Sequence, residues 1–293
     1  MPDRVSVRAP ATIANLGPGF DCLGVAIAWH NEIRVERDPG GGLTVTAAGH
    51  GADEIPRDAS NLAVRAIATV LGSSNGLRVH LTNAIPFGRG FGSSAAAIVG
   101  GMRAAHALEG KHASAASFVN AAAALEGHAD NVAPCILGGA VAVAGDTVLP
   151  LGAPAGIEIL VCVAPMALST EAARKALPAE VAFSDAAANA GRAALLTAAL
   201  LSGEAGHLLS ATEDRLHQPP RFALMPASGR LVEQLRNAGI AAFLAGAGPS
   251  VAGLVPAASA AAAEASARGL APDGWEVRRT SFDGAGAVVV ESA

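Results

Sequence analysis

The chain has 293 residues, of which 51% are hydrophobic, 15% are charged and 34 are glycine. This composition excludes a disordered or fibrous protein. A chain with so many apolar residues gains more free energy from burying them than its conformational ordering costs. The formal net charge of -5, with no block of like charges, argues against a nucleic-acid partner, which would need a basic stripe. We expect one or two compact domains and a small-molecule partner.

The ends of the chain and its cysteines indicate where the protein works. Charged residues Asp3, Arg4 and Arg8 precede any apolar run, which predicts no signal peptide. The long apolar stretch 241–263 contains prolines and many small residues, so it does not read as a membrane span. Three widely spaced cysteines indicate reduced thiols. The sequence predicts a cytoplasmic protein without a membrane partner.

The first half of the chain predicts strands followed by helices. Alternation of apolar and polar residues indicates half-buried strands at 4–8, 32–36, 43–47 and 77–81. Helical spacing or apolar character predicts helices over Asn61–Leu71, Ser93–Leu108 and Ser114–Leu125. After a loop, a hairpin follows over Ala140–Leu151, turning at Gly145-Asp146. The Pro- and Gly-containing segment 152–156 is the best domain boundary.

The second half predicts one strand, a helical stretch and a mixed tail. The strand is Ile157–Val163, and the helices are Glu171–Leu177, Asp185–Leu201, Glu204–Leu216 and Gly229–Ala238. The tail predicts strands Ile240–Leu244 and Val251–Val255, helix Ala257–Arg268, and strands Trp275–Ser281 and Ala287–Val290. We therefore expect two α+β domains, residues 1–154 and 155–293.

A glycine-rich segment, Pro86 to Ala96, is the strongest local signal. Glycine at every second position lets the backbone approach a ligand, while Ser93 and Ser94 stand where an N-cap and first helical turn are expected. Unpaired N–H groups and the helix dipole then favour a phosphate. The alternative is a plain glycine turn before a buried helix. The spacing matches neither a Walker A motif nor the Rossmann fingerprint.

Three further segments carry polar groups. Glu126 to Asn131 places two carboxylates, an imidazole and a carboxamide within six residues, which is suited to a divalent cation on phosphates or to simple capping of the next element. The opening, Arg8 to Gly24, predicts a strand running into a turn-rich loop with Asn15 and Asp21. Ala245 to Ser250 alone reads as a tight hairpin between two strands.

Together these four segments resemble the GHMP kinases, over nearly the whole chain and in the family's order. The P-x-G-x-G-L-G-S-S-A-A loop is matched at Pro86 to Ala96, with Phe91 for the usual leucine, and the G-A-G-P-[ST] motif at Gly246 to Ser250. The opening Pro10 to Asp21 is similar to the homoserine kinase family. Further matches to that family are Gly127 to Pro134, Ser169-Thr170 with Arg174, and His217 to Arg221, where Pro220 replaces an aromatic residue.

The resemblance implies a fold and a reaction. The fold is an N-terminal ribosomal-S5-domain-2-like domain that binds ATP and a C-terminal ferredoxin-like domain, with the active site between them. The reaction is ATP-dependent phosphorylation of the side-chain hydroxyl of L-homoserine to O-phospho-L-homoserine, in threonine biosynthesis. The cofactors implied are ATP and Mg²⁺, and a homodimer is expected. The alternatives are a GHMP-type kinase of another small alcohol, or a non-catalytic nucleotide- or amino-acid-binding regulator on the same fold.

The resemblance also implies roles for individual residues. ATP is held by Pro86, Gly88, Arg89, Gly90, Phe91, Gly92, Ser93, Ser94 and Ala95, with Asn61 and Leu62, from a D-x-x-N-L segment that starts at Asp58, at the adenine. Ser94 and Glu126 hold the metal. The substrate is bound by Asn15, Asp21, His128, Asn131, Arg174 and Arg221.

The residues expected to carry catalysis are Asn131, Glu126 and Ser94. Mevalonate-type relatives place an aspartate near the attacking hydroxyl, but Asn131 stands at the matching position, and the matching lysine position near Thr12 is not basic. Asp130 and Asp21 are the nearby carboxylates. We hypothesise that no side chain acts as a strong general base, and that catalysis comes from positioning and electrostatic stabilisation.

Overall fold

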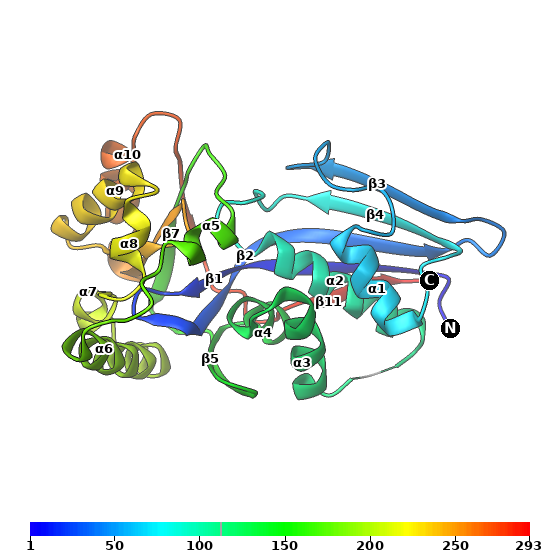
Figure 1. Cartoon of the computed structure of the whole chain (residues 1–293), viewed down its shortest axis with the longest axis horizontal. Coiled ribbons are helices and arrows are strands. Elements are labelled where there is room, and N and C mark those ends of the chain that lie inside the picture. Colours follow the sequence, from blue (N-terminus) through cyan, green and yellow to red (C-terminus); the bar gives the residue numbers. More distant parts are fainter. Residues whose placement is uncertain (112) are drawn as a thin grey trace.

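The computed structural model describes residues 1–111 and 113–293, and the strands in that part of the chain form two sheets (Figure 1). The first sheet has seven strands: β1 (Arg4–Asn15), β2 (Gly19–Arg37), β3 (Leu43–Gly49), β4 (Leu77–Asn83), β5 (Ala140–Ala144), β6 (Thr147–Gly152) and β11 (Val288–Ser292). Its path is β11–β1–β2–β4–β3, and the hairpin β5–β6 adds to β2. Only β3 and β4 pair in parallel among these described strands.

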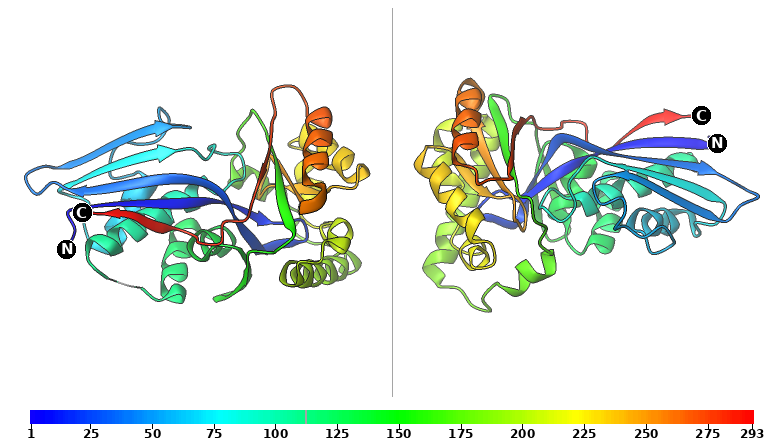
Figure 2. Two further views of the ribbon diagram at one scale, coloured as in Figure 1. Left: turned by 180° about the vertical axis from the view of Figure 1, so that it is seen from behind. Right: turned by 90° about the horizontal axis from the view of Figure 1, so that it is seen from above.

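Four helices lie on one side of the first sheet (Figure 2). They are α1 (Leu62–Leu71), α2 (Ser93–Leu108), α3 (Ala115–Glu126) and α4 (Ala129–Leu137). Two glycines bring α2 very close to its neighbours: a Cβ on Gly100 would lie 2.4 Å from Ile33 Cδ1, and one on Gly101 would lie 2.6 Å from the Ala63 carbonyl oxygen. Small residues thus let α2, whose first turn lines the site described below, pack directly on the sheet.

The second sheet has the order β10–β7–β9–β8, with all pairings antiparallel. Its strands are β7 (Ile157–Val163), β8 (Ala241–Leu244), β9 (Val251–Pro256) and β10 (Glu276–Thr280). Helices α9 (Pro226–Asn237) and α10 (Ala260–Leu270) pack on one face. With one helical stretch between β7 and β8 and another between β9 and β10, this is the ferredoxin-like arrangement that the family resemblance implies.

The remaining helices connect β7 to β8 or precede α10. They are α5 (Thr170–Lys175), α6 (Phe183–Ser202), α7 (Leu208–Ala211), α8 (Gln218–Phe222) and the 3-10 turns η1 (Ala205–His207) and η2 (Ala257–Ser259). Within residues 1–111 and 113–293, no helix combines the length and the apolar character that crossing a bilayer requires.

The two sheets share apolar packing. Along β7, Ile159 and Val161 belong to the apolar cluster that contains the first-sheet strands and α2, whereas Leu160 and Cys162 belong to the smaller cluster under α9 and α10. Successive side chains of a strand point to opposite faces. One face of the second sheet therefore packs against the first domain, which fixes the two halves of any site that lies between them.

The predicted order of the elements is confirmed in most places, including the bounds of α2 and the hairpin turn at Gly145-Asp146. The sheets do not follow the expected division into residues 1–154 and 155–293 at the tail. After β10 the chain returns to the first sheet, where β11 pairs with β1, so the two termini lie side by side (Figure 2).

Three expectations were wrong in detail. The opening is not a strand with a turn-rich loop, because β1 and β2 together form one long hairpin whose turn is residues 16–18. The loop expected after Leu125 contains α4, with Pro134 inside it. The helix predicted over Glu204–Leu216 ends at Ala211, since the carboxylate of Asp214 accepts the N–H groups of Leu216, His217 and Gln218 and holds a turn there.

Candidate functional site

A cavity of about 410 Å³ opens between the two domains. The first domain lines it with the β1–β2 turn, the glycine loop, the first turn of α2 and the start of α4. The second domain lines it with residues 167–170, with Arg174 of α5 and Arg221 of α8, and with residues 246–248. The four segments singled out in the sequence therefore meet at one place.

The first turn of α2 offers free backbone donors to this cavity. Gly88, Gly90 and Gly92 have φ of 66°, 87° and 63°, a backbone that favours glycine. The N-cap is Gly92, not a serine, and it makes no side-chain cap. The N–H groups of residues 93–95 have no acceptor within the described part of the chain. Such donors at the start of a 16-residue helix make a site for an anion.

Close backbone contact joins the glycine loop to the second domain. A Cβ on Gly90 would lie 2.0 Å from the carbonyl oxygen of Ala245, and one on Gly246 would lie 3.2 Å from that of Gly90. The guanidinium of Arg89 donates to the carbonyls of Phe87, Ala164 and Pro165. Since these bonds engage all three of its nitrogens, the Arg89 side chain holds the loop against the strand end after β7.

Phe91 likewise supports the loop from behind. Its side chain is buried and its ring lies 5.4 Å from that of Trp29, centroid to centroid. Arg89 and Phe91 both line the cavity, but their side chains are engaged elsewhere. Their predicted part in the nucleotide site stays a prediction, and it would fall to their backbone.

Ser94 and Glu126 place a hydroxyl and a carboxylate beside this anion site. The Ser94 hydroxyl donates to Glu126 Oε2 at 2.6 Å, and both residues line the cavity. Burial raises the pKa of Glu126, while the bond from Ser94 acts in the opposite direction. No group of three or more His, Cys, Asp or Glu side chains is arranged to hold a metal ion by itself within residues 1–111 and 113–293. One carboxylate and one hydroxyl fit Mg²⁺, which takes few protein oxygens and fills its shell with phosphate and water.

The start of α4 contributes Asn131, His128 and Asp130. Thr12 Oγ1 donates to Asn131 Oδ1 at 2.8 Å, so the oxygen end of this carboxamide is engaged. His128 Nδ1 lies 3.0 Å from Asp130 Oδ1, and this carboxylate raises the pKa of His128. Asp130 is buried and lines the cavity. It lies beside the predicted site residues, although the sequence offered no role for it beyond proximity.

Charged side chains gather where the two domains face each other. Arg174 makes a bidentate pair with Asp21, with both N···O distances 2.9 Å. Arg221 is only 2% exposed, and burial followed by the charge of Arg174 lowers its pKa. The two guanidinium carbons lie 5.4 and 5.3 Å from the centre of the Phe20 ring. One aromatic ring thus supports both arginines through cation–π contacts.

The β1–β2 turn has an unusual backbone. Asn15, Leu16 and Asp21 are the only non-glycine residues with positive φ in the described part of the chain, at 73°, 50° and 55°. Asn15 stabilises this shape, because its Oδ1 accepts the Asp21 N–H and its Nδ2 donates to the Gly246 carbonyl. Strained backbone that neighbouring contacts hold in place is typical of functional sites.

Most of the predicted site residues thus line one cavity. The exceptions are Asn61, Leu62 and Ala95. Asn61 is buried and caps α1, accepting the Ala63 N–H and donating to the Pro56 carbonyl, so its polar atoms are occupied away from the cavity. Sequence reasoning named Asp130 only as a nearby carboxylate, and it missed Leu168, which lines the cavity, and the contacts of His217. His217 belongs to the recognised motif His217 to Arg221, and that motif is the sequence signal that could have identified it.

Comparison with known proteins gives a consistent result. Family models described as the GHMP kinases N terminal domain and the GHMP kinases C terminal match residues 61–139 and 196–271. The chain is 44% identical to a homoserine kinase of Streptomyces avermitilis, over 99% of this chain and 96% of that protein. It is 43% identical to a homoserine kinase of Streptomyces coelicolor, over 99% and 95%.

Solved structures agree with the sequence relatives. The crystal structure of homoserine kinase from Cytophaga hutchinsonii has a TM-score of 0.89 and 30% sequence identity, covering 99% of this chain and 98% of that one. A mevalonate kinase structure with a TM-score of 0.70 and 15% identity, covering 95% and 99%, shares the fold alone.

Proposed function

This chain belongs to the GHMP kinases and, among them, to the homoserine kinase family, and from that membership we infer that it transfers the γ-phosphoryl group of ATP to the side-chain hydroxyl of L-homoserine. The products are ADP and O-phospho-L-homoserine, a step of threonine biosynthesis. One structural observation carries the assignment: a helix N-terminus with free donors and a cluster of one carboxylate and two guanidiniums line the same cavity.

The nucleotide end of the site is built from backbone. We assign the triphosphate to the N–H groups of residues 88–94, which cover the glycine loop and the start of α2. Ser94 and Glu126 would hold Mg²⁺, which when bound neutralises charge on the β- and γ-phosphates. Burial disfavours the charged form of Glu126, and a cation at this place would reverse that preference. Asn61 and Leu62 remain predictions for the adenine pocket.

The acceptor end is built from charged side chains. L-Homoserine carries an α-carboxylate, an α-ammonium and a hydroxyl. We assign the carboxylate to Arg174 and Arg221, because a guanidinium binds a carboxylate through charge-assisted, often bidentate bonds. Asp21 receives the ammonium, with Asn15, His128 and Asn131 supplying further hydrogen bonds.

The pair between Asp21 and Arg174 suits a zwitterion. The two side chains bond to each other in this structure. An amino acid can separate them and give each a new partner of opposite charge, so that neither charge loses its compensation. An acceptor with a carboxylate but no ammonium would leave Asp21 without a partner, which provides a physical reason for preferring homoserine over mevalonate.

Positioning, rather than a strong base, carries the reaction in this proposal. Asn131 is a carboxamide whose oxygen already accepts from Thr12, so it can orient the hydroxyl but cannot remove its proton. Of the nearby carboxylates, Asp21 is assigned to the ammonium of the substrate, and Asp130 lies 3.0 Å from His128 Nδ1. The proton of the hydroxyl then leaves to the transferred phosphate or to solvent.

Identification of the product tests the assignment. The purified protein with ATP, Mg²⁺ and L-homoserine should give a phosphate monoester on the side-chain oxygen, seen by ³¹P NMR with coupling to the adjacent methylene protons. Omission of homoserine is the control. If ADP forms at the same rate with and without homoserine, or if no ester appears, the proposed function is wrong.

Two expectations about the whole protein remain predictions. A homodimer is expected from the family, and analytical ultracentrifugation would measure it. A cytoplasmic location is expected from the sequence, and localisation of a tagged protein would measure that.

A further inference from the structure

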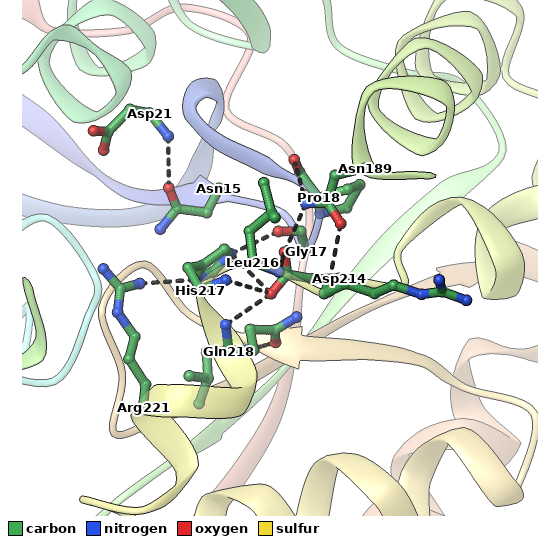
Figure 3. A network of polar contacts seen from close by, with 12 residues as sticks. Asn15, Gly17, Pro18, Asp21, Asn189, Asp214, Leu216, His217, Gln218 and Arg221 are labelled. Carbon is green, nitrogen blue, oxygen red and sulfur yellow. Dashed lines mark hydrogen bonds and ion pairs between the residues drawn. The ribbon is translucent and has the colours of Figure 1, made fainter. Parts of the chain in front are cut away.

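His217 lies between the β1–β2 turn of the first domain and Arg221 of the second (Figure 3). Its ring is 1% exposed. Nε2 is 2.7 Å from the Gly17 carbonyl oxygen, and Nδ1 is 2.8 Å from Arg221 Nη1. Neither neighbour has a choice of role: a carbonyl oxygen only accepts a hydrogen bond, and a guanidinium only donates.

These two contacts determine where the ring proton lies. Nε2 must carry a hydrogen in order to donate to Gly17, and Nδ1 must be bare in order to accept from Arg221. The ring is therefore the neutral Nε2–H form. Burial, and less strongly the charge of Arg221, lower the pKa of His217, while Asp214, the Gly17 carbonyl and Asp21 act the other way.

The ring is itself firmly held. Asp214 accepts the backbone N–H of His217 at 3.1 Å and the amide of Asn189 at 2.7 Å (Figure 3). Asn189 in turn donates to the carbonyl of Pro18. The Phe20 ring stacks on the imidazole, with centroids 5.1 Å apart and planes at 30°. His217 can therefore act as a fixed acceptor.

Arg221, the hydrogen-bond donor to His217, has one guanidinium nitrogen without a partner among the described residues. Arg221 Nε donates to the Ala173 carbonyl, and Nη1 donates to His217 Nδ1, with a longer contact of 3.5 Å to the Gly246 carbonyl. Nη2 has no partner in the described part of the chain, and Arg221 lines the cavity. Figure 3 shows this nitrogen pointing away from His217.

We propose that His217 is a positioning residue for the acceptor: its bare Nδ1 fixes the rotation of the Arg221 guanidinium, so that Nη2 is presented to the carboxylate of homoserine. The inference rests on the proposed function, because the carboxylate is that of the proposed substrate. It assigns to His217 no contact with the substrate and no proton transfer.

Two isosteric variants test the inference. In His217→Asn the amide oxygen takes the place of Nδ1 and can still accept from Arg221, whereas in His217→Gln the terminal amide takes the place of Nε2 and reaches only Gly17. We expect His217→Asn to keep the KM for homoserine within about threefold of wild type and His217→Gln to raise it about tenfold or more, since a hydrogen bond to a charged group is lost. The KM for ATP should not change in either variant.

A role in packing alone predicts the reverse order, because glutamine fills more of the ring volume and keeps the bond to Gly17. Equal KM values for homoserine in the two variants, or a better His217→Gln, would overturn the inference. The wild-type protein gives a second test that needs no stable variant. ¹⁵N NMR of labelled histidine should show a non-protonated Nδ1 at His217 at neutral pH, and a protonated Nδ1 would overturn the inference. Both tests are separate from the proposed function, which fails only if wild type makes no phosphohomoserine.

Discussion

The two ends of the cavity are built in different ways. At the proposed nucleotide end, the free donors are the backbone N–H groups of residues 93–95, directly after the glycine loop, and the side chains of Arg89 and Phe91 are engaged elsewhere. At the acceptor end, the groups are side chains from strands and helices far apart in the chain, among them Asp21, Arg174 and Arg221. Every nucleoside triphosphate presents the same phosphates, so backbone suffices there, whereas selection of one small acceptor needs particular charges.

The difference also determines what each end tolerates. Backbone donors survive most side-chain substitutions but fail when a Cβ enters the loop. A charged side chain, by contrast, can be removed by a single substitution. Its loss should lower kcat/KM for the acceptor without changing the KM for ATP. Substitutions at the two ends should therefore have different effects, which distinguish a site built from backbone donors from one built from charged side chains.

Arg221→Ala should have the largest effect. Because the guanidinium is buried and paired with His217, its loss should cost about 2–5 kcal/mol, or a fall of roughly 30- to 4,000-fold in kcat/KM for homoserine. Steady-state kinetics should show an almost unchanged KM for ATP. Arg230→Ala, an exposed arginine on α9, is the matched control. A fall below tenfold would remove the role assigned to Arg221.

Glu126→Gln should have the next largest effect. The substitution keeps the shape and the bond from Ser94 but removes the charge, so we expect kcat to fall by about 100-fold, with a higher Mg²⁺ concentration at half-maximal rate. Rates measured across a Mg²⁺ titration check this. Glu233→Gln, on the exposed face of α9, should behave as wild type. An unchanged Mg²⁺ dependence in Glu126→Gln would place the metal elsewhere.

Gly90→Ala tests the close backbone contact between the glycine loop and Ala245, with the free energy of unfolding as the measured quantity. Both Gly90 and the control Gly72 have positive φ, but a Cβ on Gly72 meets nothing within 4 Å, whereas one on Gly90 meets the Ala245 carbonyl at 2.0 Å. Gly72→Ala should lose about 1–2 kcal/mol of unfolding free energy, and Gly90→Ala about 1–3 kcal/mol more. Urea unfolding measures both. Equal losses would mean that the close approach of the two loops does not exist.

His128 should give the smallest effect, visible as a pH dependence. Its pKa is raised above the ordinary 6.5, mainly by Asp130, so the pair stabilises the folded state fully below pH 6.5 and loses this contribution as pH rises through the raised pKa. The difference in unfolding free energy between wild type and His128→Gln should be below about 1 kcal/mol and should shrink with increasing pH. A difference that grows above pH 7 would contradict this sign.

The nucleotide end was predictable from the sequence because its parts are contiguous. Eleven consecutive residues give the glycines, the serines and the helix start, and the bounds of α2 match the prediction. The sequence did not reveal that Gly92, rather than a serine, is the N-cap. It also did not reveal how the Arg89 and Phe91 side chains are engaged, since their partners Ala164, Pro165 and Trp29 belong to other parts of the chain.

The acceptor end was predictable only in part. Family resemblance names Asp21, Arg174 and Arg221, but spacing alone says nothing of their bonds to one another or to His217. Local rules also failed around these residues. Asp214 ends the helical pattern because its carboxylate accepts three backbone N–H groups. Helix α8, which contains Arg221, was not predicted because Pro219 and Pro220 do not read as part of a helix. The return of β11 to the first sheet depends on pairing across the whole chain, which periodicity cannot reveal.

In the proposed function, the acceptor end of the cavity selects a zwitterionic hydroxy amino acid for phosphorylation. A coupled ADP-release assay with L-homoserine, L-serine, L-threonine and mevalonate as separate acceptors tests it most directly. We expect the highest kcat/KM for homoserine and no turnover of mevalonate above the acceptor-free rate. Turnover of mevalonate but not homoserine would contradict it.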